Sequence, residues 1–138
     1  MAGLEGGCLC GAIRYRLTER PQGIAYCHCG KCRRASGAPV LVFGTVALAA
    51  LAIERGAPRR YRSSDIGERW FCGDCGCQIA MRVDYQPETI DVAIATLDTP
   101  EASPPQFHIW HASRIGWFDT ADRLERHADG GPDGPEAG

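Results

Sequence analysis

Eight cysteines in a chain of 138 residues constrain the possible folds more than any other feature of this sequence. They fall into three clusters, which are Cys8-x-Cys10, Cys27-x-Cys29-x2-Cys32 and Cys72-x2-Cys75-x-Cys77. A tight turn can present two thiolates a few ångströms apart and so hold a tetrahedral metal ion without strain. The spacing therefore predicts metal ligands.

The number of ligands in each cluster indicates how the clusters pair. Cys8 and Cys10 supply only two thiolates, so they need a second pair of ligands. Cys72 and Cys75 are the obvious donors, although they lie far along the chain. A shared ion would join the two ends of the fold, and four closed protein ligands are typical of a structural zinc site.

The middle cluster, formed by Cys27, Cys29 and Cys32, offers three thiolates within six residues. Three protein ligands with an open fourth position are typical of a catalytic zinc site. The sequence therefore predicts two zinc ions per chain, one structural and one catalytic.

Other uses of the cysteines stay open at this level. A disulfide framework needs an oxidising compartment, but residues 1–5 have neither the basic nor the apolar region of a signal peptide, so we expect a cytoplasmic protein with free thiols. An iron–sulfur cluster is also compatible, because spacing alone does not identify the ion. A metal-free redox dithiol at Cys29-x2-Cys32 lacks the long helix pattern of a thioredoxin around it.

Composition limits the fold and the partners. With 44% hydrophobic residues and a net charge of −2, the chain is predicted to be one globular domain over residues 1–128, followed by a mobile tail over residues 129–138 that is rich in glycine and proline. Thiolate-rich metal sites would make the charge more negative, so we expect no nucleic-acid partner. The oligomeric state is not readable from the sequence.

The apolar pattern predicts mainly antiparallel strands and only short helical turns. Residues 12–17, 79–83 and 90–94 alternate between apolar and polar, and the last two segments would pair with each other. The uncharged stretch 38–53 is too short and too broken to span a membrane, so we expect no membrane contact. Further strands are predicted at about residues 40–43, 48–53, 59–62 with Tyr61 inward, 68–71 and 107–110, and one helical turn at residues 33–36 that ends at Gly37.

Three motifs in this order resemble the glutathione-dependent formaldehyde-activating enzyme family, which also includes centromere protein V. The motifs are Gly6-Gly7-Cys8-Leu9-Cys10-Gly11, Cys27-His28-Cys29-Gly30-Lys31-Cys32 and Arg69-Trp70-Phe71-Cys72-Gly73-Asp74-Cys75-Gly76. The resemblance extends over the chain to about residue 129, and residues 108–110 and 116–118 are similar to the C-terminal part of the family.

The resemblance implies an Mss4-like β-tent of stacked antiparallel sheets with two zinc sites, structural at Cys8, Cys10, Cys72 and Cys75 and catalytic at Cys27, Cys29 and Cys32. It also implies carbon–sulfur lyase-type chemistry, in which the thiol of glutathione adds to formaldehyde. The expected partners are thus a small-molecule thiol, with glutathione as co-substrate, and a small aldehyde.

Several neighbouring side chains have two readings. Lys31, Arg33 and Arg34 could hold a substrate carboxylate or could be solvated surface charges. His28 is expected to point away from the ion, because it alternates with two ligands. His108 and His111 could line the pocket or be core or surface histidines.

The remaining predictions concern packing and an alternative function. Cys77 is read as a buried or pocket-lining free cysteine rather than as a fourth ligand that closes the second zinc site. Trp70, Phe71, Trp110 and Trp117 are predicted to lie in the core. The alternative function is a zinc-stabilised structural or binding module without catalysis, for which the feature to look for is a basic patch of Arg14, Arg16, Arg33 and Arg34.

Overall fold

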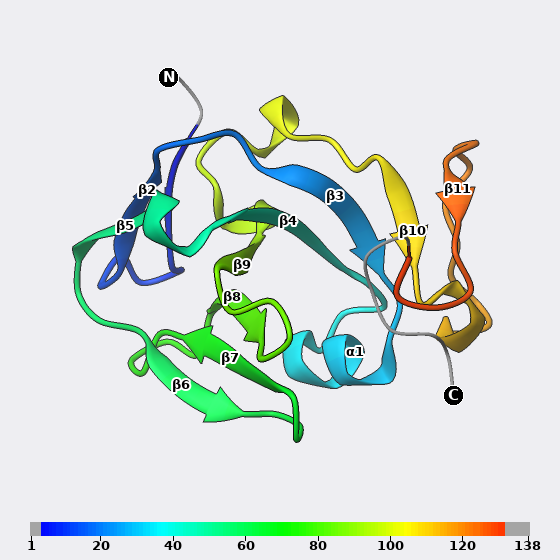
Figure 1. Cartoon of the computed structure of the whole chain (residues 1–138), viewed down its shortest axis with the longest axis horizontal. Helices are drawn as coiled ribbons and strands as arrows, with labels where there is room; N and C mark the ends of the chain where they lie inside the picture. Colours follow the sequence, from blue (N-terminus) through cyan, green and yellow to red (C-terminus); the bar gives the residue numbers. More distant parts are fainter. Residues whose placement is uncertain (1–3, 132–138) are drawn as a thin grey trace.

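The computed structural model describes residues 4–131. Within them, one helix, α1 (Gly30–Ser36), accompanies eleven strands (Figure 1). The strands are β1 (Glu5–Gly7), β2 (Arg14–Leu17), β3 (Gln22–Cys27), β4 (Leu41–Ala47), β5 (Leu51–Arg55), β6 (Arg59–Arg62), β7 (Gly67–Phe71), β8 (Gln78–Val83), β9 (Thr89–Ala93), β10 (Phe107–Ile109) and β11 (Glu125–Arg126). Short 3₁₀ turns cover Leu48–Ala50, Ile94–Thr96, Pro100–Ala102 and His111–Ser113.

The strands form two sheets. The smaller has the order β1-β2-β5, and the larger has the order β11-β10-β3-β4-β9-β8-β7-β6. All the paired strands are antiparallel except β10, which runs parallel to both β3 and β11. The prediction of a mainly antiparallel β protein with little helix is confirmed, and the parallel pairs are an addition that the sequence pattern did not indicate.

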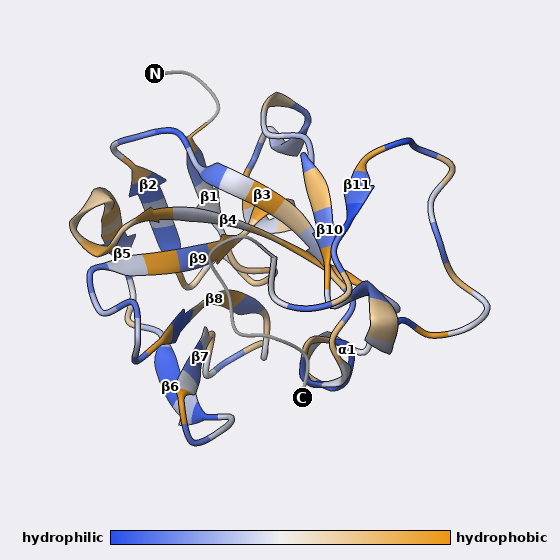
Figure 2. Ribbon diagram, turned by 45° about the vertical axis from the view of Figure 1, so that its right-hand side comes forward, coloured by the Kyte–Doolittle hydropathy of each residue, from blue (hydrophilic) through white to orange (hydrophobic). Residues whose placement is uncertain are grey.

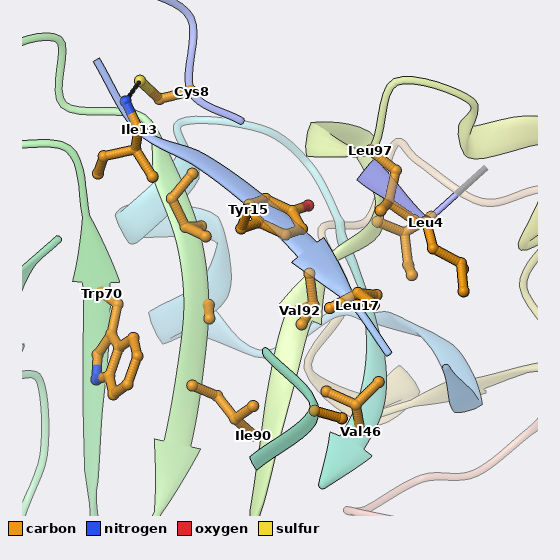
Figure 3. Close-up of a cluster of buried hydrophobic side chains, with 14 of the residues drawn as sticks. Leu4, Cys8, Ile13, Tyr15, Leu17, Val46, Trp70, Ile90, Val92 and Leu97 are labelled. Atoms are coloured by element: carbon orange, nitrogen blue, oxygen red, sulfur yellow. Dashed lines mark hydrogen bonds between the residues drawn. The ribbon is translucent and has the colours of Figure 1, made fainter. Parts of the chain in front are cut away.

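The alternating segment that we expected at residues 12–17 forms β2 from residue 14 onward and contributes to the main core. Ile13, Tyr15 and Leu17 are buried, whereas the arginines between them reach the surface. Figure 3 shows these side chains among Val46, Ile90, Val92 and Trp70, which come from the larger sheet. Each fully buried large apolar side chain stabilises the fold by about 1.5–3 kcal/mol, so this cluster is what packs one sheet on the other.

The uncharged stretch folds differently from the prediction of two strands at 40–43 and 48–53. β4 continues through Gly44 to Ala47, because a side chain at Gly44 would lie within 3.1 Å of Pro21, Ile94 and Ile24 and only glycine fits the crossing. Leu48–Ala50 is a 3₁₀ turn, and the second strand starts only at Leu51.

Two aromatic predictions were wrong. Tyr61 is 65% exposed, because β6 is the outermost strand of the larger sheet and all four of its residues are exposed. Trp117 is 75% exposed and Trp70 only 7% exposed, so just the latter is a true core residue. Phe71 and Trp110 are partly buried. In Figure 2, β6 is largely coloured as hydrophilic, as expected of an edge strand.

The predicted helical turn is confirmed and is longer than expected. α1 begins at Gly30, where the thiol of Cys29 accepts a hydrogen bond from the Cys32 N–H. It ends at Gly37, which has φ 69° and donates its N–H to the Arg33 carbonyl. The helix therefore places two cysteines at its start, beside the end of β3.

The chain end is fixed to the sheet as far as the structure describes it. The Trp110 N–H donates to the Asp129 carbonyl at 2.7 Å, and a side chain at Gly131 would touch Ile109. The rest of the predicted mobile tail, residues 132–138, lies outside the described residues. The described part of the chain contains no helix that is long and apolar enough to cross a membrane.

Replacing Gly56 should lower the free energy of unfolding by more than its positive φ alone would cause. Gly56 and Gly37 both have positive φ, 75° and 69°, but only at Gly56 would a Cβ overlap the carbonyl oxygen of Ala12. We expect Gly37→Ala to cost about 1 kcal/mol of unfolding free energy and Gly56→Ala about 3 kcal/mol, measured by urea denaturation. Equal losses would contradict this account.

Candidate metal and substrate site

The four-cysteine cluster joins the two sheets. Cys8 and Cys10 lie in the β1–β2 connection, and Cys72 and Cys75 lie in the β7–β8 connection. Their four sulfurs lie within 4.8 Å of one another, and Cys10 Sγ is 3.7 Å from Cys8 Sγ and 3.8 Å from Cys72 Sγ. An ion at about 2.3 Å from each of four tetrahedral sulfurs would set them ~3.8 Å apart, so the residues fit a tetrahedral metal.

Backbone donors surround the same sulfurs. The Ile13 N–H donates to Cys8 Sγ at 3.2 Å, the bond drawn dashed in Figure 3. The Cys75 N–H donates to Cys72 Sγ at 3.4 Å. Although burial raises the pKa of Cys8, the Ile13 N–H and the neighbouring thiols lower it to about 6. These donors favour thiolates, the form in which cysteine binds metal.

The three-cysteine cluster lies where β3 meets α1. Cys27, Cys29 and Cys32 have their sulfurs within 4.8 Å of one another, and Cys27 Sγ and Cys32 Sγ are 3.1 Å apart. This distance is shorter than tetrahedral coordination needs, so these two sulfurs would separate slightly to share an ion. Hydrogen bonds from Cys27 and Cys32 lower the pKa of Cys29, and hydrogen bonds with Cys29 and Cys32 raise the pKa of Cys27. The donor set suits a soft, thiolate-binding metal.

A cavity of about 880 Å³ opens over the three-cysteine cluster. All three of its cysteines line the cavity, together with apolar side chains that include Phe43 and Met81. The volume is in the range of small-molecule sites. By contrast, the cysteines of the other cluster do not contribute to its wall.

The floor of the cavity is a row of residues that face one another across five strands. Strand register places Gln22 opposite Thr45, Thr45 opposite Asp91, Asp91 opposite Met81 and Met81 opposite Arg69. All five line the cavity. Adjacent strands are about 4.8 Å apart, so Asp91 and Arg69 leave the sheet ~10 Å from each other with Met81 between them.

The two charged residues of this row have different surroundings. Burial raises the pKa of Asp91, and the Thr45 hydroxyl donates to its carboxylate at 2.6 Å. Arg69 is buried, and its Nη2 donates a hydrogen bond to Cys32 Sγ at 3.6 Å. Sequence reasoning placed Arg69 in a motif but assigned it no role.

The three cations predicted beside the cluster lie on α1. Lys31 and Arg34 are exposed and contribute to the wall of the cavity, so they lie at its rim. Arg33 is partly buried and donates from Nη2 to the Ser113 carbonyl at 3.4 Å. It is not among the residues that line the cavity.

The histidines pack behind the cluster. His28 and His108 are fully buried, and His28 Nε2 lies 2.8 Å from His108 Nδ1. His108 Nε2 lies 3.1 Å from the Thr120 hydroxyl and 3.3 Å from Asp122. Neither these two histidines nor His111 line the cavity. The backbone N–H of His28 also donates to the Ile109 carbonyl at 3.1 Å. Together with the contact between the His28 and His108 rings, this bond anchors the cysteine-bearing segment to β10.

Cys77 belongs to the other side of the molecule. It packs against the main core, and its pKa is raised mainly by burial and further by the nearby Cys75, Cys8 and Cys72. It is therefore a partly buried cysteine beside the four-cysteine cluster, and it is not placed to close the three-cysteine cluster. All eight cysteines are free.

The basic patch of the alternative function is not assembled. Arg14 forms an ion pair with Asp98, and Arg16 Nε lies 3.6 Å from Glu54. Both arginines are on β2, at the left of Figure 1, whereas Arg33 is on α1, below the centre. The four arginines thus fall into two pairs on different elements, and the pair on β2 has acidic partners.

Comparisons with known proteins agree with the motifs. The family model described as glutathione-dependent formaldehyde-activating enzyme matches residues 3–113. A protein of Halomonas elongata named as a putative enzyme of this kind is 26% identical over 129 residues, with 87% of this chain and 82% of the relative covered. An uncharacterized lyase of Schizosaccharomyces pombe is 33% identical over 72 residues, which cover 52% of each chain. A crystal structure of a Rhodobacter sphaeroides protein superposes with a TM-score of 0.58 at 28% identity, covering 73% of this chain and 96% of that one.

The four-cysteine cluster should be needed for stability. Cys72→Ala removes one of its sulfurs, and we expect a loss of at least about 3 kcal/mol of unfolding free energy, because metal binding contributes to folding. Cys77→Ala, a few residues along the same connection, should cost about 1 kcal/mol. Urea denaturation of metal-loaded protein measures both values. Similar losses for the two variants would show that the cluster does not hold the sheets together.

Asp91 should lower stability at neutral pH. Since burial raises its folded pKa, the stability that its protonated form contributes is full below the ordinary value of 3.8 and is lost as pH rises through the folded value. Asp91→Asn should therefore melt higher than the wild type at pH 7, with a difference that shrinks towards pH 4. Asp84→Asn is the control, because the Arg62 guanidinium lowers the pKa of Asp84 and its loss should bring no gain.

Proposed function

The chain belongs to the glutathione-dependent formaldehyde-activating enzyme family, and from this premise we propose that it is a zinc-dependent carbon–sulfur lyase-type enzyme. Its substrates would be adducts of glutathione, or of a similar thiol, with formaldehyde or another small aldehyde. Cys27, Cys29 and Cys32 would hold the catalytic zinc, and Cys8, Cys10, Cys72 and Cys75 the structural one.

One observation carries the proposal, namely that the two cysteine clusters differ in access. The cluster with three sulfurs opens on a cavity of about 880 Å³, whereas the cluster with four sulfurs contributes nothing to that cavity. Three ligands that face a substrate-sized space leave a coordination position that a ligand can reach. Four ligands contributed by connections of two different sheets favour a structural role.

The chemistry needs a thiolate next to an aldehyde. A zinc ion bound by three cysteines would favour the thiolate form of a substrate thiol at neutral pH. The apolar wall, with Phe43 and Met81, would exclude water from the reacting carbon. Lys31 and Arg34 at the rim, with Arg33 beside them, would attract the carboxylates of a glutathione-like thiol.

In the addition direction, the sulfur electron pair forms the carbon–sulfur bond while the carbonyl pair moves onto oxygen. That oxygen then takes up one proton from water. The lyase direction is the reverse, in which the hydroxyl proton is lost, the carbonyl re-forms and the thiolate leaves. No oxidant or reductant is required, so free thiols in a reducing compartment suit the reaction.

Loss of Cys29 should separate this function from a purely structural module. We expect wild-type protein to contain two zinc ions per chain and Cys29→Ala to contain one, with turnover lowered by at least about 100-fold, or ~2.7 kcal/mol. Elemental analysis gives the zinc content, and nuclear magnetic resonance follows the adduct from glutathione and formaldehyde.

Cys77→Ala is the matched control, since Cys77 lies outside both clusters. It should keep two zinc ions and turnover close to that of the wild type. If wild type and Cys29→Ala convert the adduct at the same rate, the zinc-dependent enzyme is excluded and the structural module is favoured.

A further inference from the structure

Arg69 is a buried cation that the described chain leaves largely unpaired. The residue is only 6% exposed, and its Nε and Nη1 atoms have no hydrogen-bond partner in the structure. A guanidinium keeps its charge at any accessible pH, so it cannot escape the cost of burial by losing a proton. Burial of this charge is costly unless it meets an anion, which either the three-cysteine cluster beside it or an anionic ligand in the cavity would supply.

No carboxylate of the described chain forms an ion pair with Arg69. The arginines that do form ion pairs are Arg14, Arg16, Arg60, Arg62, Arg82 and Arg126. The nearest carboxylate of its row, Asp91, is two strands away and accepts from Thr45 instead. The remaining contact is the one to Cys32 Sγ.

The position of Arg69 directs this charge into the cavity. Along β7, Gly67 and Arg69 line the cavity, while Trp70 packs in the core on the other face of the strand. Nη2 reaches Cys32, so the free nitrogens lie close to the three cysteines. Arg34 also lines the cavity, but it is exposed, and water and salt weaken its attraction for anions.

We propose that Arg69 is the anion-binding residue of this cavity and that its free guanidinium nitrogens take an anionic oxygen of the ligand beside the three cysteines. The inference rests on the proposed function for the identity of that oxygen. It is either a carboxylate of the thiol or the aldehyde oxygen, which becomes negative when the carbon–sulfur bond forms. Arg69 gives up no proton in either case, and the oxygen is protonated later from water.

The main test compares Arg69→Met with Arg60→Met. Arg60 stacks 4.2 Å from the Trp70 ring and does not line the cavity, so it is a matched arginine on the same pair of strands. We expect Arg69→Met to lower kcat/KM by about 100- to 1,000-fold, as loss of a buried oxyanion donor does. Its melting temperature should equal or exceed that of the wild type, because an unpaired buried charge is removed. Arg60→Met should keep wild-type kcat/KM.

The kinetic constants distinguish the two sources of the oxygen. A carboxylate bound before the reaction would make the loss appear in KM, whereas an oxygen that becomes negative in the transition state would make it appear in kcat. Arg69→Lys keeps the charge but not the fork of donors, so it should restore part of the lost activity.

A binding measurement makes the inference independent of turnover. Formate, a small carboxylate, should raise the melting temperature of wild type and Arg60→Met in a concentration-dependent way and should not affect Arg69→Met. If formate binding depends on Arg69 while no aldehyde adduct is converted, the proposed function fails and the anion site stands.

Three results would overturn the inference. Formate could stabilise Arg69→Met as much as the wild type. Arg69→Met could melt well below the wild type, which would assign the residue a structural role. It could also lose one of two zinc ions by elemental analysis, in which case Arg69 serves to balance the charge of the thiolates.

Discussion

The tie between Cys8, Cys10, Cys72 and Cys75 is the constraint on which the rest of the structure depends. β1 and β2 belong to the small sheet and β7 and β8 to the large one, so these sulfurs connect two layers that share no strand. The apolar core of a small domain contributes limited stability, and a metal held by these four sulfurs would add to it. β7 is also the strand that carries Arg69 into the cavity, so the same tie fixes the floor of the site.

The three-cysteine cluster is held together by local chain geometry rather than by contacts between the two sheets. Cys27 ends a strand and Cys32 lies in the first turn of a short helix, so local chain geometry brings the two together. Support comes from the buried His28–His108 pair, which holds this segment to β10. The three cysteines are thus supported from behind while one side of their cluster remains open to the cavity. One set of cysteines thus lies where the two sheets meet, and the other set lies at the cavity.

Most of the fold and the grouping of the cysteines could be predicted from sequence, for physical reasons. Strand periodicity and cysteine spacing are local signals, and they correctly indicated β2, the β8–β9 pair and the helical turn before Gly37. Tyr61 and Trp117 were misjudged because burial depends on which strand lies at the edge, and that is decided by long-range pairing. Arg69 was missed for the same reason. Only the register with Met81 and Asp91 reveals that it faces a cavity, and only the surrounding contacts reveal that it lacks a partner.

The parallel pairing of β10 with β3 has a consequence for how the protein is made. His108 lies 80 residues after His28, so the strand that ends at Cys27 keeps an unpaired edge until those residues have been synthesised. At roughly 5–20 residues per second, this interval on the ribosome lasts ~4–16 s. During that time the strand that carries Cys27 lacks one of its two neighbours. The speed of translation thereby sets how long this edge of the sheet stays open.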